Sequence, residues 1–147
     1  MNDTPIDDDA LLDAAREATA DAIVPYSGFR VGATLMTADG HLYTGANFEV
    51  SNYSNSLHAE EVALARALID GARSFTAVAV ASSEPSLVTP CGMCRQTLAE
   101  YCQPDLRVIC KVGDDGARQF TIGELLPAAF NGDDLTRYPH HESMFQC

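Results

Sequence analysis

The 147-residue sequence contains no tryptophan and very little positive charge. Its only lysine is Lys111, and eight arginines stand against 21 acidic residues, so the formal net charge is −12. Nucleic-acid binders need a basic patch to neutralise phosphates, so this composition argues against a polyanionic partner. The acidic balance favours a surface that stays soluble under salt screening. A halophilic source is one hypothesis, and an ordinary acidic cytosolic enzyme is the alternative.

Long apolar runs are also missing. No stretch is long enough to span a bilayer, and the N-terminus is acidic where a secretory signal needs positive charge and an apolar core. We therefore expect no membrane partner and a reduced, cytoplasmic setting. In such a compartment the five cysteines stay free of disulfides and are available to bind metal.

The length of the chain fits one domain spanning residues 1–147, and we expect its ends at 1–9 and about 132–147 to be loosely ordered. Asp7 to Asp9 can cap a first helix, which apolar periodicity places from Ala10 to about Val24. Pro25 ends it. Thr121 to Glu124 fits the capping box of a short helix late in the chain.

Between these ends, a hairpin is followed by helices that alternate with two continuous apolar runs. The predicted strands are Arg30–Met36, Leu42–Gly45, Phe75–Ala81 and Leu106–Val112, and the predicted helices start near Ala59 and Cys91. A βαβαβ order after an opening hairpin favours a mostly parallel sheet between helices. The polar, irregular segment from Asn47 to Leu57 is long enough to suggest a binding loop.

Two short motifs carry the chemistry: His58-Ala59-Glu60, and the run from Pro90 to Gln96 that contains Cys91 and Cys94. One imidazole and two thiols suit zinc, which keeps its fourth position for water when it acts as a catalyst. Cys91 and Cys94 are three residues apart, so they share one face of a helix. Glu60 is left over, and a carboxylate beside such a water can carry protons.

Each motif alone is ambiguous. A lone Cys-x-x-Cys also fits a redox pair, half of a structural zinc site or two core cysteines. The two motifs together, with Pro90 before the first cysteine, match the signature of zinc-dependent nucleobase deaminases. A closed structural zinc site is disfavoured because a fourth Cys or His at usable spacing is missing.

Over nearly its whole length the chain resembles the short, homotetrameric class of cytidine deaminases. The matching pieces are Pro25–Ser27, Phe29–Ala33, Gly45–Glu49, Tyr53-Ser54, His58–Glu60, Pro90–Gln96, and Glu124–Pro127 with Phe130. The resemblance implies a three-layer α/β/α fold around a mixed, mostly parallel five-stranded sheet. It also implies a homotetramer whose pockets are completed by neighbouring subunits.

The resemblance further implies one Zn²⁺ per subunit, held by His58, Cys91 and Cys94, with Glu60 as the proton carrier. The reaction would be hydrolysis of cytidine or 2′-deoxycytidine at C4, giving uridine or 2′-deoxyuridine and ammonia. The residues implied to contact substrate are Phe29, Asn47, Glu49, Ala59, Thr89 and Phe130, with Tyr53 as a further residue that closes the pocket. Asn47 and Glu49 would clamp the ribose 3′-hydroxyl by donating and accepting hydrogen bonds.

These residues also have simpler interpretations. Phe29 and Phe130 can be ordinary core residues, and Asn47 with Glu49 can be a solvated loop. Cys102 and Cys110 fit small buried hydrophobes, Cys147 an exposed tail thiol, and His41, His140 and His141 surface residues.

One position departs from the family pattern. Many relatives of the short class carry a third cysteine in place of His58, with an arginine where this chain has Glu61. Two thiolates and a neutral imidazole already balance Zn²⁺, so the arginine is dispensable here. Arg95, next to Cys94, remains available to hydrogen-bond a thiolate.

Three hypotheses follow: a deaminase of cytidine and 2′-deoxycytidine, a deaminase of another small nucleoside such as blasticidin S, and a zinc-stabilised interaction module without turnover. Glu49 favours the first, since its carboxylate suits an unmodified ribose. The sequence does not choose between ribose and deoxyribose, because both carry the 3′-hydroxyl.

Overall fold

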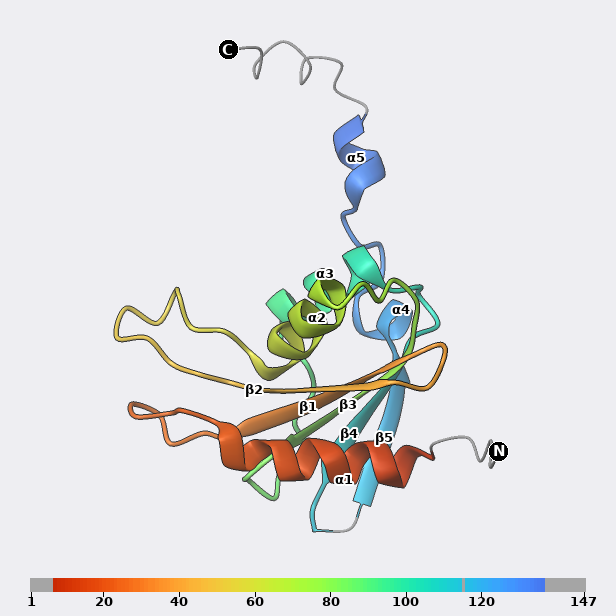
Figure 1. Ribbon diagram of the computed structural model, residues 1–147. Helices are drawn as coiled ribbons and strands as arrows, with labels where there is room; N and C mark the ends of the chain where they lie inside the picture. Colours follow the sequence, from red (N-terminus) through yellow and green to blue (C-terminus); the bar gives the residue numbers. More distant parts are fainter. Residues whose placement is uncertain (1–6, 115, 137–147) are drawn as a thin grey trace.

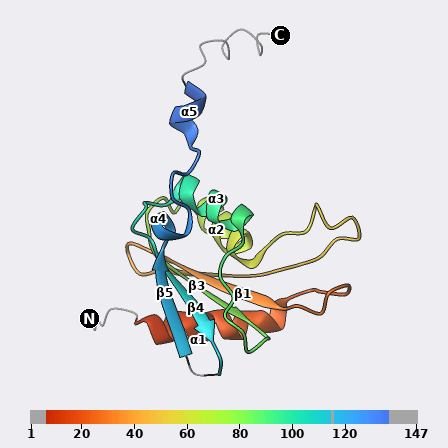
Figure 2. The same ribbon diagram turned by 180° about the vertical axis from the view of Figure 1, so that it is seen from behind.

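The computed structural model describes residues 7–114 and 116–136. Its centre is a five-stranded sheet in the order β2-β1-β3-β4-β5. Figures 1 and 2 show helix α1 on one face of this sheet and helices α2, α3 and α4 on the other, which is the predicted three-layer arrangement. Within the described ranges, no helix combines the length and apolar character needed to cross a bilayer.

The sheet is mixed, and the prediction that it is mostly parallel is wrong. Its strands are β1 Val31–Thr37, β2 Leu42–Ala46, β3 Phe75–Ser82, β4 Arg107–Val112 and β5 Gly116–Thr121. Only β3 and β4 pair in parallel, whereas β1 pairs antiparallel with both β2 and β3, and β5 pairs antiparallel with β4. The four predicted strands occur in the predicted order, whereas β5 was not predicted from the residues. The opening hairpin places β1 beside β3 in the antiparallel sense, and β5 returns along β4. A single crossover through α3 therefore makes the one parallel pair.

Helix α1 (Asp8–Ala18) covers one face of the sheet and is shorter than predicted. Asp7 is its N-cap and accepts a hydrogen bond from the backbone N–H of Ala10 at 2.8 Å, as the acidic start suggested. The helix gives way to a short 3₁₀ turn, Thr19–Asp21. The Arg30 guanidinium donates to the backbone carbonyls of residues 19, 20 and 22 at this end. A side chain from outside the helix thus provides hydrogen bonds to the carbonyls at its C-terminal end, which lies before Pro25.

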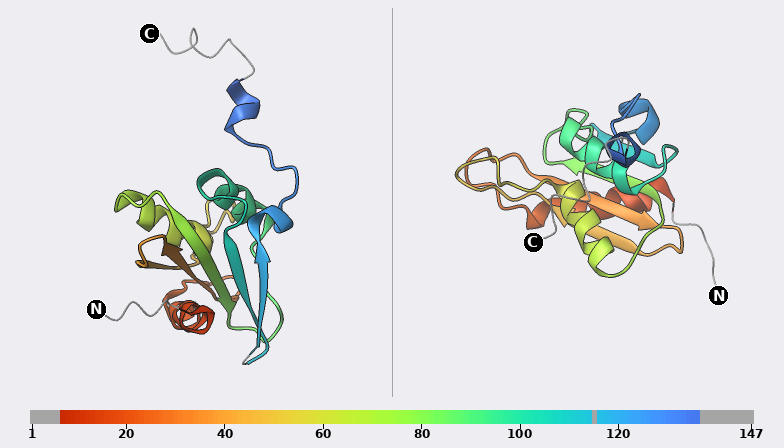
Figure 3. Two further views of the ribbon diagram at one scale, coloured as in Figure 1. Left: turned by 90° about the vertical axis from the view of Figure 1, so that its right-hand side faces the viewer. Right: turned by 90° about the horizontal axis from the view of Figure 1, so that it is seen from above.

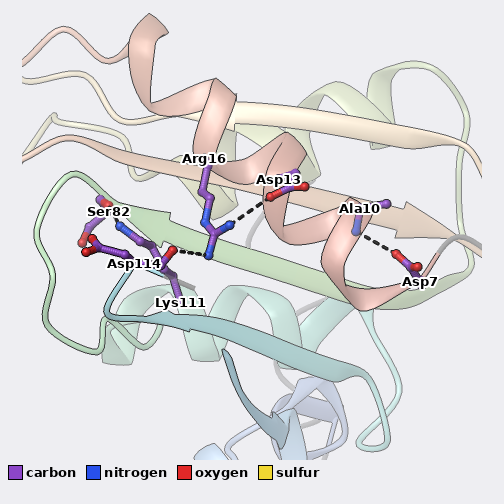
Figure 4. Close-up of polar contacts among 7 residues, drawn as sticks. All are labelled: Asp7, Ala10, Asp13, Arg16, Ser82, Lys111 and Asp114. Atoms are coloured by element: carbon purple, nitrogen blue, oxygen red, sulfur yellow. Dashed lines mark hydrogen bonds and ion pairs between the residues drawn. The ribbon is translucent and has the colours of Figure 1, made fainter. Parts of the chain in front are cut away.

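Helix α1 is also hydrogen-bonded to the turn between β4 and β5. Arg16 donates to the backbone oxygen of Asp114, in the turn between β4 and β5, at 2.8 Å, and pairs with Asp13 at 2.9 Å. Figure 4 shows Arg16 reaching this turn beside Lys111, whose ammonium donates to the Ser82 carbonyl at 3.4 Å. The only lysine of the chain is thus used to hold the ends of β3 and β4 together.

The larger part of the core lies on the opposite face, beneath α2 (Ala59–Ile69) and α3 (Gly92–Tyr101). Leu35, Val80 and Val108 from the strands pack there against Leu64 and Leu98 from the helices. The continuous apolar runs predicted as buried strands are β3 and β4, and β3 is buried at all but one position. Packing on both faces explains why these two strands show no polar alternation.

The end of the chain is partly ordered. Helix α4 (Ile122–Leu125) starts with the predicted Thr121–Glu124 capping box. Helix α5 (Gly132–Thr136) occupies part of the segment expected to be loose, and Figures 1 and 3 show it projecting from the helical layer. His140, His141 and Cys147 lie outside the described residues.

Candidate metal centre and adjoining cavities

The two chemical motifs stand at the N-termini of neighbouring helices. His58 is the N-cap of α2, and Cys91 is the N-cap of α3. Cys94 follows in the first turn of α3. The partial positive charge of both helix ends therefore faces the same place, and it favours thiolates there. The predicted convergence of the motifs is present in the structure.

Three ligand atoms meet at this point. The Nδ1 atom of His58 lies 3.2 Å from the Sγ atom of Cys91 and 3.2 Å from that of Cys94, and the two sulfurs are 3.7 Å apart. A tetrahedral zinc ion with ordinary bond lengths places two sulfur ligands about 3.8 Å apart, and sulfur and nitrogen about 3.5 Å apart. The donor set and its spacing fit zinc. Within the described residues, no other group of His, Cys, Asp and Glu side chains converges in this way.

The centre is buried on one side and open on the other. Cys94 is 1% exposed, and burial raises the pKa of its thiol, whereas Cys91 is exposed. Glu60, in the first turn of α2, is 4% exposed. Burial raises the pKa of its carboxyl, and hydrogen bonds from its own backbone and from Cys94 oppose that shift. A carboxyl whose pKa is pushed upward beside a metal site is suited to taking and returning a proton.

A cavity of about 190 Å³ opens in front of these groups. Phe29, Asn47, Ala59 and Thr89 line it, as does Cys91, together with His58 and Glu60. Seven residues predicted from sequence thus border one space. Val31 and Val88 complete its walls and were not predicted. Val31 is the first residue of β1 and stands two positions after Phe29, so the alternation of an extended chain could have indicated it.

A second cavity, of about 230 Å³, lies next to the first and shares Asn47 and His58 with it. Its other lining residues come from the irregular segment predicted as a binding loop: Phe48, Glu49, Tyr53, Ser56 and Leu57. Tyr53 has a left-handed backbone with φ 55°, and its ring meets Tyr26 edge to face at 5.8 Å. This contact joins the two loops that project together in Figure 1.

The polar side chains between the loops are already engaged. Asn47 accepts from the Val31 N–H and donates to the Phe29 carbonyl, both at 2.9 Å. Glu49 accepts from the backbone N–H groups of Tyr26 and Ser27 and from the Ser27 hydroxyl. That hydroxyl is the largest reason why the pKa of Glu49 lies below its ordinary value. Both side chains hold the walls of the cavities in place.

The hydrogen bonds of Arg95 differ from the prediction. Its guanidinium donates to the carbonyls of Pro90 at 2.7 Å and Leu125 at 3.0 Å, and to the Thr89 hydroxyl at 3.0 Å. None of these partners is a thiolate. Arg95 instead ties the segment that precedes Cys91 to helix α4.

Phe130 lies apart from both cavities of its own chain. It is 57% exposed, and its carbonyl accepts from the Gln96 amide at 2.7 Å. The alternative that Phe130 is a core residue is also not observed. Cys102 and Cys110 are buried, as predicted for small hydrophobes, and burial raises the pKa of each thiol to about 12.

Residues 5–110 match the family model described as the cytidine and deoxycytidylate deaminase zinc-binding region. The chain is 40% identical over 131 residues to a cytidine deaminase of Sporosarcina psychrophila, covering 89% of this chain and 96% of that protein. It is 39% identical over 130 residues to a cytidine deaminase of Halalkalibacterium halodurans, covering 88% and 98%.

Solved structures show the same likeness. The crystal structure of cytidine deaminase from Burkholderia pseudomallei superposes with a TM-score of 0.79 at 41% identity, over 82% of this chain and 97% of that one. The cytidine deaminase from Mycobacterium tuberculosis superposes with a TM-score of 0.73 at 37% identity, over 82% and 94%.

Proposed function

The chain belongs to the family of zinc-binding cytidine and deoxycytidylate deaminases, and we propose that it deaminates the free nucleosides cytidine and 2′-deoxycytidine. The reaction is hydrolytic: water adds to C4 of the base, the C4–N bond breaks, and ammonia and the uracil nucleoside leave. The observation that carries the proposal is the convergence of His58, Cys91 and Cys94 beside the buried carboxyl of Glu60, at the wall of a cavity.

A zinc ion held by these three side chains supplies Lewis acidity that makes water nucleophilic at neutral pH. Glu60 moves the protons. It takes one from the attacking water and delivers it to N3 of the cytosine ring. It then takes the second from the hydroxyl on C4 and passes it to the amine, which leaves as ammonia while the C4 carbonyl forms. Its burial suits this task, because burial raises the pKa of the carboxyl and so makes the neutral form easier to reach.

The first cavity matches a base and the second a sugar. About 190 Å³ is below the roughly 300–1,000 Å³ of sites for drug-sized ligands, so this space suits a single ring. The aromatic face of Phe29 and the apolar walls Val31 and Val88 favour a flat heterocycle there. The adjoining cavity brings Asn47 and Glu49 beside the ring, where we propose that they contact the 3′-hydroxyl of the sugar.

The charge of the cavities supports nucleosides over nucleotides. Among the described residues that line the two spaces, none is lysine or arginine, and the acidic ones are Glu49 and Glu60. A 5′-phosphate would meet like charge and find no cation to neutralise it. The same charge pattern accommodates both ribose and 2′-deoxyribose, because the two sugars differ only in an uncharged 2′-hydroxyl.

The loss of ultraviolet absorbance as cytidine becomes uridine tests this proposal directly. We expect turnover of cytidine and 2′-deoxycytidine, and a kcat/KM at least about 100-fold lower for 2′-deoxycytidine 5′-phosphate, since like-charge contacts cost several kcal/mol. Ammonia measured in the same sample is the second readout. A zinc-loaded protein that releases no ammonia from any of the three would instead be a deaminase of another small nucleoside or an interaction module without turnover.

We also propose a homotetramer in the cytoplasm. Apolar side chains on the outer face of α2 and α3 support it: Ile69 is 88% exposed, and Met93 and Tyr101 are about half exposed. Phe130 fits here as a residue that reaches a neighbouring pocket. Sedimentation equilibrium measures the assembly, and an F130A variant that loses affinity for cytidine in the tetramer would support the shared pocket. The cysteines in the described part of the chain, which are Cys91, Cys94, Cys102 and Cys110, are free thiols, the form that cysteine keeps in a reducing compartment.

A further inference from the structure

Two different helices carry the three ligands, so their spacing decides whether the donor atoms meet. Helix α2 presents His58 at its N-cap, and helix α3 presents Cys91 and Cys94 in its first turn. Backbone bonds within each helix cannot set the distance between them. A side chain that contacts both helices beside the ligands is therefore a candidate for positioning.

Glu61 makes such a contact. Its Oε2 atom accepts from the backbone N–H of His58 at 3.4 Å, and its Oε1 atom accepts from the hydroxyl of Thr97 at 3.3 Å. The first bond belongs to the capping box of α2. The second crosses to α3, where Thr97 stands one turn after Cys94 on the same face. One carboxylate thus links the backbone of one ligand to the helix of another.

The Thr97 hydroxyl is itself held in place. It also lies 3.0 Å from the Met93 carbonyl, so its proton is shared between that carbonyl and Glu61. Both Glu61 and Thr97 are half buried, which protects the bond from competition with water. A carboxylate is tolerated here because two thiolates and a neutral imidazole leave a zinc centre with no net charge.

We propose that Glu61 is a positioning residue for the zinc site, which bridges α2 and α3 and holds the imidazole of His58 at its distance from the two sulfurs. Its effect is on how long zinc is retained, and it takes no part in proton transfer. The inference rests on the proposed zinc site, since it concerns the same three ligands.

Zinc release from the holoenzyme into excess chromogenic chelator tests the bridge. We expect the zinc release rate of E61A to rise about 10–100-fold, because removing a residue that hydrogen-bonds a metal ligand usually weakens metal affinity by that factor. T97V removes only the hydroxyl and should give a smaller increase. The double variant E61A/T97V should release zinc no faster than E61A, because the hydroxyl acts through the carboxylate. E100A is the matched control, since Glu100 is exposed on α3, and its rate should equal that of the parent protein.

Further readouts separate positioning from general stability. Per zinc-loaded site, E61A should keep the KM for cytidine. Loss of its capping-box bond should lower the denaturant midpoint of its zinc-free form, so T97V, which keeps that bond, shows whether zinc release rises without this loss. Equal zinc release from E61A and the parent protein would overturn the inference while leaving the proposed function intact. A parent protein that binds no zinc would instead overturn the proposed function. Should E61A fail to fold, an unchanged release rate in T97V overturns the bridge by itself.

Discussion

The backbone of Gly45 in β2 lies directly against the first turn of α2, so that a Cβ atom on Gly45 would stand 2.3 Å from the carbonyl oxygen of Ala59. The same Cβ would lie 2.5 Å from the backbone nitrogen of Ala63. Ala59 separates His58 from Glu60, so this approach seats the zinc ligand and the proposed proton carrier on the edge of the sheet. Only glycine permits it, because the opposing atoms are backbone and cannot rotate away.

We therefore expect G45A to push the start of α2 outward. Overpacking of this kind costs about 1–3 kcal/mol of unfolding free energy, and the displaced His58 should also weaken zinc binding. Denaturant unfolding and zinc content after dialysis measure the two effects. G92A is the control, because nothing lies within 4 Å of a Cβ there, and it should change stability by less than about 0.5 kcal/mol. Equal stability of G45A and G92A would contradict the argument.

Replacement of Glu60 separates metal binding from chemistry. In E60Q the side chain keeps its shape but cannot carry a proton, whereas His58, Cys91 and Cys94 are untouched. We expect zinc content to stay at one per chain and kcat to fall by about 10²–10⁴-fold, the usual contribution of general acid–base catalysis. Metal analysis and the absorbance assay are made on the same sample. Turnover that survives at the parental rate would show that another group moves the proton.

The centre was predictable because its ligands are local. His58 and Cys91 are helix N-caps, and a cap is specified by the few residues that follow it. The two motifs therefore also indicate where α2 and α3 begin. Because zinc binds imidazole and thiolate ligands together, the residue types alone predict that the two motifs meet, without any knowledge of the distance between them in space. The capping box at Thr121 was readable for the same reason.

Features that depend on distant partners were not predictable. The guanidinium of Arg95 is adjacent to Cys94 in sequence, yet its partners include Leu125, thirty residues away, and no local pattern indicates that bond. The sense of strand pairing has the same origin. β1 lies antiparallel to β3 because the connection through the loops and α2 returns the chain to the opposite end of the sheet. Val88 lies in a loop without periodicity, so its place in the cavity wall had no signal.

The contact between Ser27 and Glu49 gives a dependence on pH. The Ser27 hydroxyl is the main cause of the lowered pKa of Glu49, so S27A should raise that pKa toward its ordinary value of 4.5. A carboxyl with a lowered pKa stabilises the fold above its ordinary pKa, and this contribution is lost as the pH falls through the native value. In S27A this contribution should therefore be smaller, and its loss should be complete at a higher pH. NMR titration of the Glu49 side chain measures the shift, and S86A, at an exposed loop serine, is the control. An identical titration curve in S27A would refute this cause.

The thiols should differ sharply in reactivity. The pKa of both Cys102 and Cys110 is raised to about 12 by burial, so at pH 8 only about one molecule in 10⁴ carries either thiolate. We expect iodoacetamide to modify Cys91 once zinc has been removed by a chelator, and to leave the two buried thiols intact until the protein unfolds. Peptide mass mapping after timed labelling distinguishes the sites. Labelling of Cys110 in the folded protein within the same time would show that the core opens far more readily than its packing implies.

The charge of the chain predicts a response to salt. With a net charge of −12, the folded protein repels itself in dilute buffer, and salt shortens the range of this repulsion from about 10 Å at 0.1 M to about 3 Å at 1 M. We expect the unfolding temperature to rise with KCl and activity to persist in molar KCl.

Replacing the exposed residues Glu17, Asp21 and Asp105 by their amides removes three negative charges from sites remote from the zinc ligands, and should flatten the rise of the unfolding temperature with KCl. Activity that is highest in dilute buffer and disappears in molar KCl would rule out a halophilic adaptation. A rise of equal slope in the amide variant would show that salt acts through the apolar core and not through surface charge.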